Sequence, residues 1–213
     1  MGMILNRPIQ GGAQLGLWSI QEREQYLQSK LILNDAEMDY INSISNAPRR
    51  REWLASRVLL KKLLKTTEFV EVRVDPDRRP RLVSLPHKIS ISHTHDFAAV
   101  VVHEEKEVGV DIEKMEGRIL RIKEKFMHPD ELKFIDAKNE EQHLYACWGA
   151  KEALFKVCPL PGVDFKSQLN LMPFDIKEEG VIDCKISKPG AEGNFQVHYQ
   201  VFGECMLTYV VHP

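Results

Sequence analysis

Hydrophobic positions along the chain fall into stretches with helical spacing and stretches with strand-like alternation. Apolar residues recur every three or four positions in the segments expected to be helices, which are 34–44, 47–64, 118–126, 128–137 and 140–157. Alternating or continuous apolar runs mark the expected strands at 14–20, 71–74, 88–92, 97–103, 105–114, 194–202 and 204–212. Helices and strands grouped in this way predict an α+β fold.

Local signals indicate where some of these elements begin. The stretch 34–44 opens with Asn34 and Asp35, which are a helix cap signal. Pro129 falls in the first turn of the stretch at 128–137, where its missing N–H group leaves no helical hydrogen bond unmade. Segment 75–80, DPDRRP, is rich in turn-forming residues and predicts a tight turn.

An internal repeat relates the two halves of the chain. Four positions recur at a constant offset of 95 residues: Trp53 and Trp148, Ala55 and Ala150, Leu59 and Leu154, Lys61 and Lys156. Upstream, Glu37 and Ile41 match Glu131 and Ile135 at an offset of 94. Chance similarity of two amphipathic helices is one explanation. We prefer duplication, which predicts two similar α+β halves, 1–105 and 106–213, forming a pseudo-dimer with the active site in the cleft between them.

Composition narrows the class of protein. The 213 residues are 43% hydrophobic and 28% charged, which is ordinary for a globular protein, and the net charge is −2. This charge argues against broad binding of nucleic acid or anionic membrane. No signal peptide and no apolar run long enough to cross a membrane is present, and the four cysteines form no CxxC pair. We therefore expect free thiols, a cytoplasmic location and no membrane partner.

The stretch WGAKEALFK (148–156) mixes charged and aromatic residues on one side of a helix. At about 100° per residue, Trp148, Lys151, Glu152, Phe155 and Lys156 fall within a little under half of the circumference. An amphipathic helix ordinarily separates apolar and charged residues onto opposite faces. The mixture therefore indicates a face with a chemical role.

The stretch GVDIE (109–113) places two carboxylates together. Side chains alternate along a strand, so Asp111 and Glu113 project from one face. Two adjacent carboxylates repel one another unless a cation lies between them, and Mg²⁺ prefers such oxygen ligands. Glu152 would supply a third carboxylate. The alternative is a solvated edge strand, and the spacing alone leaves both interpretations open.

Two further segments suggest phosphate binding. In SISHTHD (90–96), Ser92 and His93 end a strand, where a hydroxyl and an imidazole could face a phosphate. One alternative is that His93 and His95 are zinc ligands. Another is that His93 has a purely structural role. Arginines also cluster in RRR (49–51) and DRRPRL (77–82), and arginine suits phosphate because its fork makes bidentate bonds. Each run by itself is equally consistent with a solvated face.

Together these segments resemble the 4′-phosphopantetheinyl transferases. GVDIE and WGAKEALFK are similar to that family's paired signature, (I/V)G(I/V)DIE and WxxKE(A/S)xxK. The segments ISISHTHD (89–96), DRRPRL and RRREWLASR (49–57) resemble three further family motifs. The length and the duplicated halves resemble the larger, Sfp-like class.

The resemblance implies a reaction and roles for the residues. Members move phosphopantetheine from coenzyme A to a serine of an acyl or peptidyl carrier protein and release 3′,5′-ADP. It implies Mg²⁺, with Mn²⁺ as an alternative, held in the second half by Asp111, Glu113 and Glu152. Glu152 and Lys156 would be catalytic, with Glu152 as the general base. Coenzyme A phosphates would be bound by Lys151 and Lys156 and, from the first half, by Ser92, His93, Arg79, and Arg49 or Arg51.

The chain departs from the family pattern at a few positions. Arg79 stands where the family usually has Lys, and Arg78 replaces the preceding Gly, so this loop must differ. Ser90 and Thr94 are polar replacements for Asn and Ser, and Ser56 replaces a Gly. None of the metal-binding or lysine positions is lost.

Three rival functions stay open. Another magnesium-dependent enzyme acting on phosphates could use the same carboxylates. A coenzyme A or carrier-protein binding module could share the fold without catalysis, although it would not need a base beside its metal. Nucleic-acid binding is disfavoured by the acidic balance. We expect a monomer, because the duplication already supplies both halves of the cleft.

Overall fold

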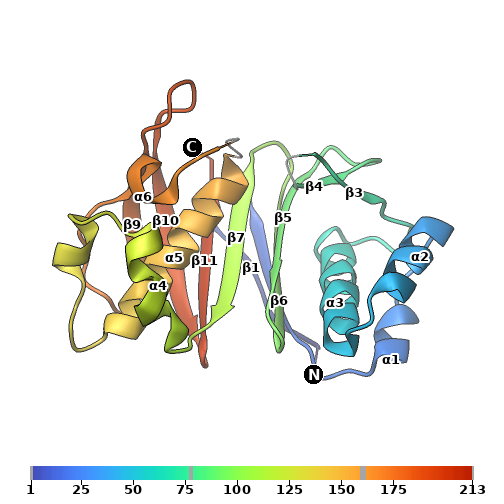
Figure 1. The fold of residues 1–213 in the computed structure, drawn as a ribbon. Helices are drawn as coiled ribbons and strands as arrows, with labels where there is room; N and C mark the ends of the chain where they lie inside the picture. The colour runs from blue at the N-terminus through green and yellow to red at the C-terminus, as the bar shows by residue number, and fades with distance from the viewer. Residues whose placement is uncertain (1, 77–78, 159–161, 213) are drawn as a thin grey trace. The chain divides into compact units, whose positions relative to one another are not determined.

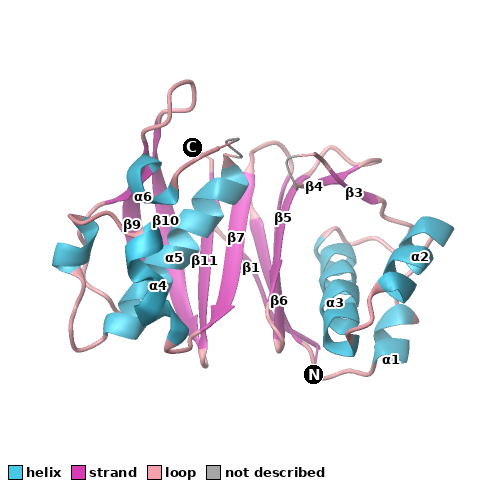
Figure 2. Ribbon diagram, in the orientation of Figure 1, coloured by secondary structure: helices cyan, strands magenta, loops and turns pink. Residues whose placement is uncertain are grey.

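A computed structural model describes residues 2–76, 79–158 and 162–212. The chain divides into two compact units, Met1–Glu105 and Lys106–Pro213, and each is described by itself. Each unit combines an antiparallel sheet with helices, as Figure 1 and Figure 2 show. The predicted α+β class is therefore confirmed.

The first unit contains three α-helices among its described residues, α1 (Glu24–Gln28), α2 (Asp35–Ser43) and α3 (Ala47–Leu63). A short 3-10 turn, η1, covers Gln10–Gly12. The strands of its main sheet are β1 (Gly2–Pro8), β2 (Gln14–Ser19), β5 (Lys88–His93) and β6 (Phe97–His103). They are ordered β1-β2-β6-β5, and β3 (Val72–Val74) pairs separately with β4 (Pro80–Leu82).

Helix α3 packs against strands β2, β5 and β6 (Figure 1). Its first turn is capped by Asn46, whose side chain accepts a hydrogen bond from the backbone N–H of Arg49. The apolar face of α3 joins the core of this unit through Leu54, Ala55, Val58 and Leu59. Burying each such leucine stabilises the fold by roughly 1.5–3 kcal/mol. The polar residues of α3 near its start are thereby fixed against the end of β5.

The second unit contains α4 (Arg118–Phe126), the long helix α5 (Glu140–Val157) and the short α6 (Phe165–Gln168). A single 3-10 turn, η2, covers Glu131–Phe134. The strands are β7 (Val108–Lys114), β8 (Leu169–Leu171), β9 (Glu179–Ile186), β10 (Gly193–Phe202) and β11 (Cys205–Val211). They form one antiparallel sheet in the order β7-β11-β10-β9-β8.

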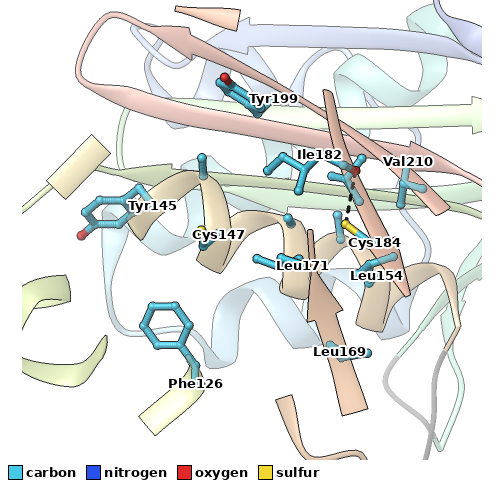
Figure 3. Packing of buried hydrophobic residues seen from close by; sticks show 14 of the residues in the cluster. Phe126, Tyr145, Cys147, Leu154, Leu169, Leu171, Ile182, Cys184, Tyr199 and Val210 are labelled. Atoms are coloured by element: carbon cyan, nitrogen blue, oxygen red, sulfur yellow. Dashed lines mark hydrogen bonds between the residues drawn. The ribbon is translucent and has the colours of Figure 1, made fainter. Parts of the chain in front are cut away.

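Helix α5 lies across the face of this sheet, mainly over β7 and β11. Its buried side includes Cys147 and Leu154, which face Ile182, Cys184 and Val210 in the core (Figure 3). The approach of β7 to α5 is very close. A Cβ atom on Gly109 would lie 2.1 Å from the carbonyl oxygen of Ala153, so only glycine fits there.

Most predicted elements are found, with differences where tertiary contacts organise the chain. The stretch 118–126 is α4, 47–64 differs from α3 by one residue, and 140–157 is α5. The predicted helix at 128–137 is wrong, because only the 3-10 turn forms there. Strands β1, β4, β8 and β9 and helices α1 and α6 were not predicted. Among the described residues, no helix is long and apolar enough to span a membrane.

Candidate active site

Four candidate residues of the second unit meet where β7 faces α5. Asp111 and Glu113 lie two positions apart on β7, on the same face as Gly109, which touches the α5 backbone. Glu152 and Lys156 lie one helical turn apart on α5. The predicted same-face placement of the two β7 carboxylates is therefore confirmed, and they point toward the helix rather than away from it.

Lys156 binds the β7 strand directly. Its Nζ atom donates to Oδ1 of Asp111 at 2.8 Å and to the backbone oxygen of Val110 at 2.8 Å. The Asp111 carboxylate is almost fully buried, whereas the Lys156 side chain retains a quarter of its exposure. An ammonium group thus lies at the edge of the carboxylate pair, with part of its surface open to a ligand.

Glu113 is oriented by two neighbours. Nε1 of Trp148 donates to Oε1 of Glu113 at 3.4 Å, and Nη2 of Arg118 lies 3.4 Å from Oε2. Trp148 in turn packs against Phe126 and Phe165, with ring centroids 5.0 and 5.9 Å apart. The aromatic residues on the mixed face of α5 therefore form a wall that holds one of the carboxylates.

The carboxylates of this site repel one another. The pKa of Glu152 is raised from 4.5 to about 7, chiefly by burial and then by the negative charge of Asp111, with Lys156 opposing the rise. Burial is also the main cause that raises the pKa of Glu113, and Asp111 adds to it. A carboxyl pKa raised to near neutrality, as at Glu152, is typical of groups that exchange protons or bind cations.

The donor chemistry of the site fits a hard divalent cation. Asp111, Glu113 and Glu152 offer only oxygen ligands, which Mg²⁺ prefers, and their mutual repulsion would be relieved by positive charge. In residues 2–76, 79–158 and 162–212, no group of three or more His, Cys, Asp or Glu side chains is placed to hold a metal as it stands. The residues fit the ion by type, while their present positions do not form a ligand cluster.

The structure corrects the sequence prediction for Lys151. This side chain is 0% exposed and does not lie with the carboxylates. Its Nζ donates to Oε2 of Glu131 at 2.6 Å and to the backbone oxygens of Phe126 and Phe165, each at 2.9 Å. The ammonium group therefore faces the interior, and its three donors are taken up by protein acceptors.

Glu131 makes further hydrogen bonds around the segment 128–137. Glu131 Oε2 also accepts from the backbone N–H of His128 at 2.7 Å, and Oε1 accepts from that of Leu171 at 2.9 Å. Its carboxylate thus ties η2 to β8 and α5 together, and the helical turn ends at Ile135, whose backbone is extended. Sequence reasoning missed this role of Glu131, although the repeat singled out its position.

A second group of candidate residues gathers in the first unit around Glu52 of α3. Oε2 of Glu52 lies 3.0 Å from Nδ1 of His93, the last residue of β5. The same oxygen lies 3.6 Å from Nη1 of Arg49. Arg51 and His95 are also near enough to act on the pKa of Glu52, which burial raises. Two predicted phosphate-binding residues are therefore joined by a carboxylate that the sequence analysis did not single out.

The other predicted residues of the first unit are placed differently. His93 shares a strand face with Ile89 and Ile91, which pack toward α3, so Ser92 projects from the opposite face of β5. The structure thus separates Ser92 from the Glu52 group. Arg79 is partly buried, and its backbone oxygen accepts from the N–H of Asp75 at 2.9 Å. Arg78, the predicted departure in that loop, lies outside the described residues.

Comparisons with known proteins match both units. A family model described as the 4′-phosphopantetheinyl transferase superfamily matches residues 107–210. A second, described as the 4′-phosphopantetheinyl transferase N-terminal domain, matches residues 36–103. A 4′-phosphopantetheinyl transferase of Bacillus subtilis is 27% identical over 140 residues, which is 63% of this chain and 60% of that protein. The match thus spans about three fifths of this curated relative.

Proposed function

Because this chain belongs to the 4′-phosphopantetheinyl transferase superfamily, we propose that it transfers phosphopantetheine from coenzyme A to a serine of an acyl or peptidyl carrier protein. The serine oxygen forms a bond to the β-phosphorus of coenzyme A. The bond from that phosphorus to the leaving oxygen breaks, and 3′,5′-ADP departs. The serine proton passes to a base on the enzyme.

The observation that carries this proposal is the group formed by Asp111, Glu113, Glu152 and Lys156. Three carboxylates and one ammonium group at one place have the charges needed to bind a cation and a pyrophosphate together. We assign the three carboxylates to a divalent cation, Mg²⁺ first and Mn²⁺ as an alternative. When bound, that cation supplies positive charge to the pyrophosphate as charge shifts toward the leaving group.

Glu152 is the proposed general base. Its pKa of about 7 leaves it partly deprotonated at neutral pH, which suits a group that must take a proton from a serine hydroxyl. No hydrogen bond or ion pair to its carboxylate is found among the described residues, so its oxygens are not committed to a structural partner. A water molecule oriented by Glu152 would serve in the same role.

Lys156 is the proposed contact to the pyrophosphate and the departing oxygen. Its partial exposure and its bonds to β7 place a positive charge at a fixed position beside the carboxylates. In the first unit we propose that His93, Arg79, and Arg49 or Arg51 bind further phosphate groups of coenzyme A. Ser92 stays a prediction. Lys151 is left out, because its ammonium group is buried against Glu131.

The second candidate is a non-catalytic module that binds coenzyme A or a carrier protein. The position of Glu152, with a pKa near neutrality beside two more carboxylates, favours catalysis, since a binding module gains nothing from a base there. We propose a monomeric cytoplasmic enzyme.

Intact-mass spectrometry of an apo acyl carrier protein tests the proposal. The carrier is incubated with this protein, coenzyme A and Mg²⁺, with EDTA as the control. We expect a metal-dependent mass gain of one phosphopantetheine. No gain across several unrelated carriers, from folded protein that binds coenzyme A, would favour the binding module. Failure to bind coenzyme A as well would overturn both functions.

A further inference from the structure

Glu52 is a buried acid among groups that carry or can carry positive charge. It is only 8% exposed, although it lies in the second turn of α3 where the helix meets solvent. Arg49 and His93 contact one of its oxygens, and Arg51 and His95 lie within electrostatic range. A carboxylate is costly to bury unless it is paired, so these neighbours are what hold it there.

A direct role for Glu52 in binding phosphate is excluded by its charge. A carboxylate facing a phosphate repels it, and this alone would weaken a site built from Arg49 and His93. The carboxylate is compatible with such a site only if it acts on the basic groups themselves. Its distances point to that arrangement, since one oxygen lies 3.0 Å from His93 and 3.6 Å from Arg49.

The contact with His93 has a definite geometric consequence. Nδ1 is the ring nitrogen nearest to Oε2 of Glu52, at 3.0 Å, and an attractive contact with the carboxylate requires a proton on that nitrogen. The Nε2 edge of the ring then faces away from the carboxylate. An acceptor fixed on one nitrogen sets both the tautomer and the direction in which the other nitrogen points, as it does for histidines that bind metals.

We propose that Glu52 is a positioning residue that holds His93 and Arg49 in the orientation needed to bind a phosphate group of coenzyme A. This inference rests on the proposed function, because it assumes that these two residues meet coenzyme A. It adds an acid to a site that the sequence suggested was purely basic. It also explains why a carboxylate occurs at this place in an arginine-rich segment.

The test compares Glu52→Gln and Glu52→Leu with Glu68→Gln, which changes an exposed acid of the same unit. Binding of coenzyme A and of 3′,5′-ADP is measured by calorimetry. We expect Glu52→Leu to weaken binding about tenfold or more, since the close charged contact that orients His93 is lost. Glu52→Gln keeps an acceptor for Nδ1, so its affinity for the ligands should lie between that of Glu52→Leu and that of the control. Unchanged affinity in both Glu52 variants would overturn the proposal.

A second readout separates positioning from general damage to the fold. The ¹⁵N shifts of the His93 ring report which nitrogen is protonated. We expect an Nδ1-protonated ring in the unchanged protein and a shift toward the Nε2-protonated tautomer in Glu52→Leu. An Nε2-protonated ring in the unchanged protein would contradict the inference. If Glu52→Leu does not fold, the same spectra of Glu52→Gln and of the unchanged protein still test the positioning role of Glu52.

The calorimetry also distinguishes this inference from the proposed function. If the unchanged protein binds neither coenzyme A nor 3′,5′-ADP, the proposed function fails, and the role assigned to Glu52 in ligand binding fails with it. If the unchanged protein binds and both Glu52 variants bind equally well, only the role of Glu52 fails. Binding that weakens in both variants, with Glu68→Gln unchanged, supports both.

Discussion

The Nζ atom of Lys156 lies 2.8 Å from Oδ1 of Asp111, which joins the last turn of α5 to the middle of β7. The close packing of Gly109 against the Ala153 carbonyl brings this helix and strand near enough for the contact. The proposed chemistry and the packing of the second unit therefore depend on one interface, that between β7 and α5.

Replacing Glu152 by Gln should abolish turnover while leaving coenzyme A binding largely intact. The amide cannot accept the serine proton, and general-base catalysis contributes about 10²–10⁴-fold. Phosphopantetheine transfer measured by intact mass, with calorimetry for coenzyme A, checks this. Glu141→Gln, in the first turn of the same helix, is the matched control. Turnover near that of the control would remove Glu152 from its proposed role.

Replacing Lys156 by Met should slow transfer by roughly 10²-fold or more, because the positive charge proposed to stabilise the departing oxygen is lost. The variant also removes a partner of the nearly buried Asp111, so we expect a stability loss of about 1–3 kcal/mol. Lys156→Arg keeps the charge and should recover part of the stability. A loss of stability in Lys156→Met with an unchanged rate would leave Lys156 with a structural role alone.

Replacing Lys151 by Met should destabilise the protein by about 3–5 kcal/mol, because it leaves the Glu131 carboxylate buried without its ion partner. Urea unfolding measures the loss. The double variant Lys151→Met with Glu131→Leu should be considerably more stable than the single one, since both charges are then gone. Lys133→Met, which removes an exposed lysine, should change stability by no more than about 0.5 kcal/mol.

The pKa of Glu152 predicts that stability falls as pH rises. Its pKa is about 7 in the folded protein and 4.5 ordinarily, so between these values the folded state binds more protons than the unfolded state. The favourable contribution of Glu152 to the free energy of unfolding is complete below pH 4.5 and is lost as the pH rises through 7. At about 1.4 kcal/mol per unit, the loss is of the order of 3 kcal/mol.

Urea unfolding in EDTA at several pH values between 4.5 and 8 measures this loss. Glu152→Gln should flatten the profile, and any remaining slope should come from Glu113, whose pKa is raised for the same reasons. Adding Mg²⁺ at high pH should restore stability in the unchanged protein if the carboxylates bind it. Identical profiles for Glu152→Gln and the unchanged protein would contradict the assigned pKa.

Local signals in the sequence determined the long elements. Helices α3, α4 and α5 follow from apolar spacing within each segment, and Asn34 indeed caps α2 through the backbone N–H of Glu37 at 2.9 Å. Strand alternation likewise placed Asp111 and Glu113 on one face. These features depend on residues only a few positions apart, and hydrogen bonds and side-chain periodicity act over that range.

Tertiary structure alone decided which partner each charged residue meets. Lys151 and Lys156 lie at opposite edges of the mixed face of α5, about 140° apart by helical spacing. The spacing does not name their partners: one is buried against Glu131, 20 residues away, and the other contacts Asp111, 45 residues away. Glu52 meets His93 only because α3 packs on β5. The free energy of a buried charge depends on the groups that surround it after folding, and no local pattern in the sequence contains those distances.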